Sequence, residues 1–168
     1  MRNAFFRSLI KAAKQNKKLF LISVDQPTGF DDELKEALGE RFMIEPISEA
    51  NIIGMASGLA ADGFIPIVFN HATFNSRRCY EQILLDSALQ KRKIILVSMG
   101  SGLATSHLGP THTSTDDIGL MRLIPGMNIL NPCNAVEVNR IFPKLINCKT
   151  PCYLRLSKYG IPRYGIEI

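Results

Sequence analysis

Five side chains in this sequence are of the types that proton transfer and ring binding require. Glu49 opens a predicted helix, and His71 and Phe74 follow a buried apolar run. His107 and His112 lie in a loop between apolar segments. Carboxyl and imidazole groups can act as general acids or bases, and a phenylalanine ring can stack on a planar ligand. The plainer interpretation is that Glu49 complements a helix dipole and the other four are core or exposed residues.

The elements that must position these side chains alternate between apolar runs of strand length and longer amphipathic stretches. Strands are predicted at residues 19–24, 41–45, 65–69, 94–98, 128–130 and 153–156. Helices are predicted at residues 31–38, 48–61, 78–90, 116–122 and 136–147. Continuous apolar strands between helices predict an α/β fold, a three-layer open and mainly parallel sheet with helices on both faces. We expect residues 1–168 to form one domain, with its sites at the carboxyl ends of the strands.

The predicted helix at residues 48–61 is rich in small residues. Ser48 is the predicted N-cap, and we expect its hydroxyl to accept a hydrogen bond from an amide of the first turn. Gly54 and Gly58 each cost about 1 kcal/mol relative to alanine inside a helix. We therefore expect this helix to approach another backbone or a partner helix closely.

Composition and short motifs argue against several classes of protein. The chain has 168 residues, of which 46% are hydrophobic, and a formal net charge of +5. Its basic residues are scattered without interleaved aromatic residues, so we expect no nucleic-acid partner. Four cysteines without a CxxC pair do not make a zinc pattern, and neither a complete GxGxxG fingerprint nor a P-loop is present.

The most apolar segment, residues 51–69, is interrupted by Gly63 and Pro66. These residues break it into two pieces, the second of which is too short to cross a bilayer, so we expect no membrane span. No leader sequence is apparent at the start of the chain, and unpaired cysteines suit a reducing compartment. We therefore expect a cytoplasmic protein.

An ordered series of short motifs along the sequence is the basis of the functional assignment. Residues 46–60 (PISEANIIGMASGLA) are followed by residues 63–68 (GFIPIV). Further markers follow in order: Phe74, residues 78–82, residues 109–112 (GPTH), Asp117, Arg122, residues 124–127 (IPGM), Asn131, Pro132, Glu137 and residues 151–155 (PCYLR). From residue 20 to residue 157 the chain resembles the pyrimidine-binding domain of the transketolase family. This resemblance implies the pyrimidine-type thiamine diphosphate-binding fold, with thiamine diphosphate as the cofactor.

The resemblance also implies roles for the residues around the cofactor. Glu49 matches the glutamate that hydrogen-bonds N1′ of the aminopyrimidine and favours the imino tautomer, whose exocyclic nitrogen removes the thiazolium C2 proton. Loss of water around a carboxyl group favours its protonated form, which suits the sharing of a proton there. Phe74 matches the aromatic residue that packs on the pyrimidine, and Arg78 is assigned to the same cofactor site. His71 stands where many members carry a second aromatic residue, so it either lines the ring pocket or has no chemical role.

The substrate side matches the family less closely. His112 matches the histidine that contacts the donor substrate and its developing oxyanion, so we predict it to be catalytic together with Glu49. Leu108 replaces an aspartate that binds a hydroxyl group of the sugar donor. Either His107 takes over that contact, or the donor is not an ordinary ketose phosphate.

Three arginines are candidate ligands of a substrate phosphate: Arg77, Arg78 and Arg122. We favour a structural interpretation, in which one or two of them form buried ion pairs with Asp116 or Asp117. The positive net charge is compatible with phosphorylated substrates in either case.

The family's active site needs parts for which this sequence shows no counterpart. These are the pyrophosphate-binding domain, whose GDG motif and downstream asparagine hold Mg²⁺ and the diphosphate, and a small C-terminal domain. We assign no metal ligand in this chain. The resemblance implies the pyrimidine-binding subunit of a split transketolase-like enzyme, active only with a separate pyrophosphate-binding subunit, in a heterotetramer with two copies of each.

The expected reaction is transfer of a two-carbon ketol unit between sugars or sugar phosphates. One alternative is a subunit of a thiamine diphosphate-dependent 2-oxo acid decarboxylase or carboligase, which Leu108 favours. Another is a non-catalytic partner subunit. Glu49 and Phe74 argue against that second alternative, because a scaffold has no use for either residue.

Overall fold

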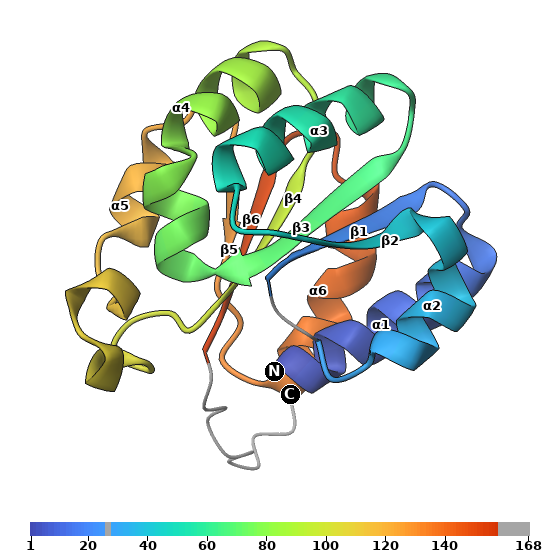
Figure 1. Ribbon diagram of the computed structural model, residues 1–168, viewed down its shortest axis with the longest axis horizontal. Coiled ribbons are helices and arrows are strands. Elements are labelled where there is room, and N and C mark those ends of the chain that lie inside the picture. The colour runs from blue at the N-terminus through green and yellow to red at the C-terminus, as the bar shows by residue number, and fades with distance from the viewer. Residues whose placement is uncertain (26–27, 158–168) are drawn as a thin grey trace.

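Six strands lie parallel in one sheet in the computed structural model, which describes residues 1–25 and 28–157 (Figure 1). Their order across the sheet is β2-β1-β3-β4-β6-β5, and every pairing is parallel. The strands are β1 (Leu19–Val24), β2 (Phe42–Glu45), β3 (Ile65–His71), β4 (Ile95–Met99), β5 (Asn128–Leu130) and β6 (Cys152–Leu156). The predicted parallel sheet is therefore confirmed.

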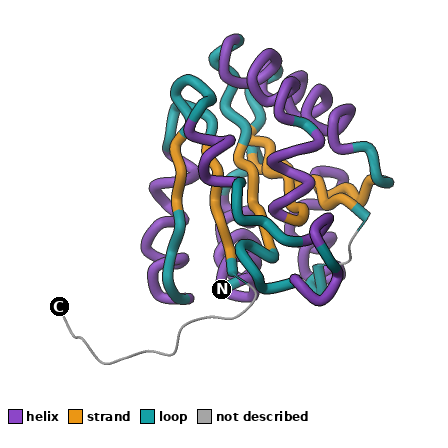
Figure 2. The backbone as a smooth tube through the Cα atoms, turned by 90° about the vertical axis from the view of Figure 1, so that its left-hand side faces the viewer, coloured by secondary structure: helices purple, strands orange, loops and turns teal. Residues whose placement is uncertain are grey.

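Helices cover both faces of the sheet, which makes the three predicted layers (Figures 1 and 2). They are α1 (Arg2–Gln15), α2 (Asp31–Leu38), α3 (Glu49–Ala61), α4 (Tyr80–Gln82), α5 (Asp117–Arg122) and α6 (Ala135–Asn147). One apolar cluster joins the sheet to α1, α2 and α6, and a second joins it to α3, α5 and the segment around α4. The prediction that residues 1–168 form one domain extends beyond the described residues and stays a prediction.

The two clusters divide the side chains of each central strand. Leu19 and Leu21 of β1 belong to the cluster with α1, whereas Phe20 and Ile22 belong to the cluster with α3. Successive side chains of a strand point to opposite faces of the sheet, and here both faces are covered. This double burial explains why the strand reads as an unbroken apolar run.

The first helix, α1, is missing from the predicted elements. Its buried side chains have helical spacing and are Phe5, Phe6, Leu9 and Ala13. The Phe5 ring meets Phe142 of α6 edge-on, with 5.7 Å between ring centroids. The amphipathic spacing of these four residues is the signal in the sequence that indicates this helix.

Helix α3 begins where it was predicted, but the predicted capping hydrogen bond is not formed. Ser48 is the N-cap residue by position. Its hydroxyl donates to the carbonyl oxygen of Pro46 at 3.3 Å and accepts no hydrogen bond from the first turn. The predicted capping bond is therefore wrong, and the serine side chain instead bonds the segment that leads into the helix.

The helix predicted at residues 78–90 starts earlier than expected. Two wide π-helical segments, η2 (Phe74–Arg78) and η3 (Ile83–Leu89), flank the short α4. Phe74 thus lies in the first turn of this irregular helix, directly after β3. No helix in the described part of the chain is long and apolar enough to cross a membrane.

Candidate functional site

Four of the predicted site residues meet at a cavity of about 290 Å³: Glu49, Phe74, Arg78 and His112. The full lining is Val24, Asp25, Ile47, Glu49, Asn70, Phe74, Arg78 and His112. Val24 and Asn70 lie at the carboxyl ends of β1 and β3, so the cavity is at the edge of the sheet where ligands of such folds bind.

Glu49 is the first residue of α3, and its side chain is only 6% exposed. Its Oε1 atom accepts hydrogen bonds from Nη1 of Arg78 at 2.9 Å and from Nδ2 of Asn70 at 3.3 Å. Asn70 is held in that orientation because its Oδ1 atom accepts from the backbone N–H of His71 at 2.7 Å. Both of these hydrogen bonds go to Oε1, so Oε2 of Glu49 has no hydrogen-bond partner among the described residues.

Asn70 is absent from the predicted site residues. The signal that could have found it is a polar residue at the carboxyl end of an apolar strand, next to His71. Its side chain positions the carboxylate of Glu49 from a different element, which residue type alone does not reveal.

Phe74 lies between a cation and two imidazole rings. The Cζ atom of Arg78 lies 3.9 Å from the centroid of the phenyl ring, which is cation–π geometry. The centroids of His71 and His112 lie 5.4 and 5.1 Å from the Phe74 centroid. The predicted ring-binding residue therefore belongs to an aromatic cluster.

His71 is a buried neutral imidazole whose hydrogen bonds assign its tautomer. The hydroxyl of Thr105 donates to the carbonyl oxygen of His112 at 2.7 Å, so it must accept from Nε2–H of His71 at 2.9 Å. The Nδ1 atom then accepts from the hydroxyl of Thr73, also at 2.9 Å. Burial, helped by the nearby His112, lowers the pKa of His71 to about 4.

The His71 ring also packs against the chain at Gly100. Gly100 has a φ of +73°, and a Cβ atom built there would overlap the His71 ring, so the position requires glycine. His71 does not line the cavity itself. Its ring contacts the rings of Phe74 and His112, and whether it has a chemical role stays a prediction.

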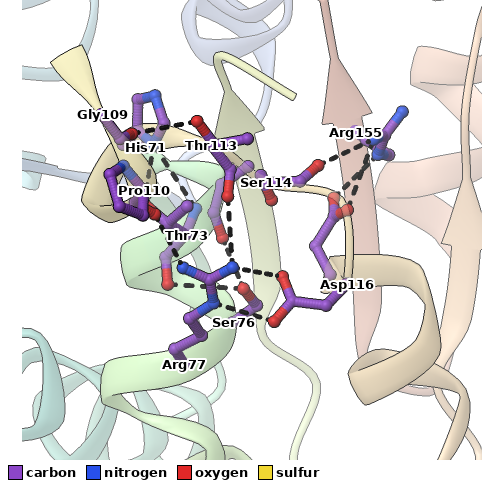
Figure 3. Close-up of polar contacts among 12 residues, drawn as sticks. His71, Thr73, Ser76, Arg77, Gly109, Pro110, Thr113, Ser114, Asp116 and Arg155 are labelled. Carbon is purple, nitrogen blue, oxygen red and sulfur yellow. Dashed lines mark hydrogen bonds and ion pairs between the residues drawn. The ribbon is translucent and has the colours of Figure 1, made fainter. Parts of the chain in front are cut away.

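The loop that carries His112 is tied down by Arg77 (Figure 3). The guanidinium donates to both carboxylate oxygens of Asp116 at 2.8 and 2.9 Å. It also donates to the carbonyl oxygens of Pro110 at 3.2 Å and Thr113 at 3.1 Å. The expected Arg77–Asp116 pair is confirmed, but it is partly exposed rather than buried. The hydrogen bonds from Arg77 lower the pKa of Asp116.

Asp117 pairs with a residue that was not predicted to meet it. The Nε atom of Arg155 donates to Oδ2 of Asp117 at 2.7 Å, and the Tyr153 hydroxyl donates to the same oxygen at 2.8 Å. Burial raises the pKa of Tyr153 far above its ordinary value. Among the three candidate arginines, Arg78 pairs with Glu49 and Arg122 is exposed, so Arg77 is the one that pairs with Asp116 or Asp117 within the described residues.

The two remaining substrate candidates lie away from the cavity. His107 and Leu108 belong to the 3₁₀ turn η4 (Ser106–Leu108), where both are exposed, and neither lines the cavity. His112 belongs to the next turn, η5 (Pro110–His112), and faces the cavity. The structure therefore brings His112 together with Glu49 and Phe74, whereas the roles of His107 and Leu108 stay predictions.

A buried carboxylate beside an aromatic ring can bind a flat nitrogen heterocycle. The carboxylate oxygens can accept from or share a proton with a ring nitrogen, while the phenyl ring packs against its face. Within the described residues, no group of three or more histidine, cysteine or acidic side chains could hold a metal ion. The carboxylate and the aromatic ring of this site can orient a ring and move a proton.

Comparison with known proteins gives a consistent picture. The family profile described as "Transketolase, pyrimidine binding domain" matches residues 1–162. The chain is 31% identical, over 96% of its length and 52% of the relative, to one of the subunits of the apulose-4-phosphate transketolase of Phocaeicola vulgatus. It is 29% identical, over 99% of its length and 52% of the relative, to the 6-deoxy-6-sulfo-D-fructose transketolase subunit SqwH of a Clostridium species. The chain thus spans about half the length of these curated relatives.

Solved structures agree with this result. A structure described as "Split gene transketolase, inactive beta4 tetramer" has a TM-score of 0.85 and 27% identity, covering 98% of this chain and 53% of that one. Transketolase from Campylobacter jejuni has a TM-score of 0.80 at 21% identity, covering 94% of this chain and 25% of that one. The second likeness concerns the fold alone.

Proposed function

The chain belongs to the transketolase family through its pyrimidine-binding domain, and from this premise we propose that it is the pyrimidine-binding half of a split transketolase. Its partner would be a separate pyrophosphate-binding subunit. The reaction would be transfer of a two-carbon ketol unit between sugars or sugar phosphates. The observation that carries this proposal is the buried Glu49 carboxylate beside Phe74 in one cavity.

The donor set of the cavity fits the aminopyrimidine of thiamine diphosphate. Glu49 offers a carboxylate to a ring nitrogen, and Phe74 offers an apolar face to the ring. The volume of about 290 Å³ corresponds to roughly ten water molecules of about 30 Å³ each. When bound, the cofactor would supply the thiazolium carbon that attacks the donor carbonyl.

The residues of this chain would then orient the ring and handle protons. Glu49 would share a proton at its carboxylate, held in place by Asn70. His112 would face the substrate from a loop that Arg77 anchors, and His71 would stay neutral behind it because its pKa is near 4. General acid–base groups placed in this way contribute about 10²–10⁴-fold to a rate.

Other parts of the active site would come from the partner subunit, including the groups that hold Mg²⁺ and the diphosphate. The outer face of α3 supports close approach by another chain, since a Cβ atom at Gly54 or Gly58 would meet nothing within 4 Å. These two glycines are therefore not explained by packing within the chain. We propose a heterotetramer with two copies of each subunit, located in the cytoplasm.

The residues of this chain do not identify the donor sugar. Leu108 cannot accept a hydrogen bond from a donor hydroxyl, and its side chain is 53% exposed. The two named relatives are both transketolase subunits, which favours ketol transfer over the 2-oxo acid alternative.

The test combines the chain with the pyrophosphate-binding transketolase subunit of the same genome, thiamine diphosphate and Mg²⁺. Glu49→Gln should lower the rate of ketol transfer at least about 100-fold, because an amide cannot exchange a proton with N1′ as a carboxyl group can. Asp62→Asn removes an exposed carboxylate at the other end of α3 and should leave the rate unchanged. Equal rates for Glu49→Gln and wild type would overturn the proposal.

A further inference from the structure

Arg78 makes two contacts of the kinds that the proposed function reserves for the cofactor ring. Its Nη1 atom donates to Oε1 of Glu49 at 2.9 Å. Its Cζ atom lies 3.9 Å from the centroid of the Phe74 ring, so the guanidinium covers that ring. A guanidinium is flat and donates N–H groups at its edge, as a protonated aminopyrimidine does.

We propose that Arg78 is a placeholder for the aminopyrimidine, which keeps Glu49 paired and Phe74 covered in the free subunit and leaves them when thiamine diphosphate binds. This inference rests on the proposed function. The covered face of Phe74 cannot hold a guanidinium and a pyrimidine ring at the same time. Arg78 therefore competes with the cofactor instead of holding it, which reverses the role that the sequence suggested.

A placeholder answers a physical problem of the free subunit. A buried carboxylate without a partner is costly, and the side chain of Glu49 is only 6% exposed. Asn70 supplies one neutral hydrogen bond at 3.3 Å, which does not balance the charge. Arg78 supplies the counter-charge until a ring occupies the cavity.

Arg78 is also free to leave, as comparison with its neighbour Arg77 shows. Arg77 donates to both oxygens of Asp116 and to two backbone carbonyl oxygens. Among the described residues, Arg78 has one side-chain hydrogen bond and one ring contact, and its side chain is 46% exposed. Its guanidinium can turn into water without opening the core.

The placeholder role predicts that removing Arg78 lowers the stability of the free subunit but raises the affinity of the complex for thiamine diphosphate. Arg78→Met keeps an apolar side chain but removes the charge, so the free subunit should melt at a lower temperature. The same change removes the competitor, so the assembled enzyme should bind thiamine diphosphate about three- to twentyfold more tightly, as expected for one partly exposed ion pair plus a cation–π contact. A residue that only stabilises the fold, or one that holds the cofactor, would not produce tighter binding.

The experiment measures both quantities in wild type, Arg78→Met and the control Arg140→Met. Arg140 is an exposed arginine on α6, so its loss changes the net charge equally without touching the cavity. Calorimetric titration of the complex with thiamine diphosphate at saturating Mg²⁺ gives the affinity, and thermal unfolding gives the stability of the free subunit. If Arg78→Met does not fold, Arg78→Lys should show the same direction with a smaller change, because lysine lacks the flat guanidinium.

A second readout follows the arginine itself. In the free subunit, the Nε–H proton of Arg78 should show a ring-current shift from Phe74 in an arginine-labelled NMR spectrum, assigned by its loss in Arg78→Met. This shift should disappear when the complex binds thiamine diphosphate.

Weaker or unchanged cofactor binding by Arg78→Met would overturn the placeholder role while leaving the proposed function intact. A ring-current shift that persists in the cofactor-bound complex would overturn it as well. If neither wild type nor Arg78→Met binds thiamine diphosphate in the complex, the proposed function fails, and the placeholder role fails with it.

Discussion

Two carboxylates in this chain are buried and paired with arginine, yet their surroundings differ. Asp117 is 1% exposed, and both of its oxygens accept hydrogen bonds from Arg155, which is itself only 16% exposed. Tyr153 adds a third hydrogen bond from β6. Within the described residues, Glu49 is hydrogen-bonded at Oε1 only, faces a cavity, and pairs with the half-exposed Arg78.

The contrast separates a structural charge, Asp117, from the charge that we propose to be functional, Glu49. The Asp117 cluster is completed by the chain itself and ties α5 to β6. The Glu49 cluster leaves one carboxylate oxygen unbonded by the described residues and a cavity beside it. Burial of a carboxylate therefore does not by itself identify a functional site. A buried carboxylate with one oxygen that lacks a hydrogen-bond partner beside a cavity is the more specific sign.

Asp117→Asn should have the largest effect on the stability of the free subunit. The substitution leaves the charge of Arg155 buried without its counter-ion, which typically costs about 3–5 kcal/mol. Urea unfolding followed by circular dichroism measures this loss. Glu49→Gln is the matched variant and should cost less than about 1 kcal/mol, because Arg78 can turn to water. The contrast is wrong if Glu49→Gln is the more destabilising of the two.

The imidazole behind the Glu49 cluster should make stability depend on pH. His71 has a pKa near 4 in the folded chain and an ordinary value of 6.5 when unfolded, so the unfolded chain binds more protons between these values. The free energy of unfolding should be highest above pH 6.5 and fall by at most about 3 kcal/mol as the pH drops to 4, at 1.36 kcal/mol per pKa unit. His71→Gln should flatten this dependence, whereas the same change at the exposed His107 should not. An unchanged pH profile in His71→Gln would refute the neutral, buried imidazole.

Arg77→Met should have a small effect on stability. The Arg77–Asp116 pair is partly exposed on both sides, so its loss should cost about 0.5–1 kcal/mol at low salt. The difference from wild type should shrink at 0.5 M NaCl, because salt screens exposed charges. A cost that equals that of Asp117→Asn and ignores salt would place this pair with the buried cluster.

Much of the fold could be predicted because central parallel strands must be apolar on both faces. The residues of β1, β3 and β4 therefore form visible runs in the sequence. Helix α1 was missed because its apolar residues are spaced along a polar stretch instead of forming a run. Glu49, Phe74 and His112 were assigned by resemblance to a family pattern, and the structure places all three at one cavity.

The sequence by itself determined the order of strands and helices and which residue types stand at the carboxyl edge of the sheet. Only the tertiary structure decided which arginine serves which carboxylate. Arg78 and Glu49 are 29 residues apart, and Arg155 and Asp117 are 38 apart. An ion pair forms between side chains that the fold brings within about 4 Å, and sequence separation carries no information about that distance. The same packing decides that Arg155 is locked in place, while Arg78 lies at the rim of a cavity.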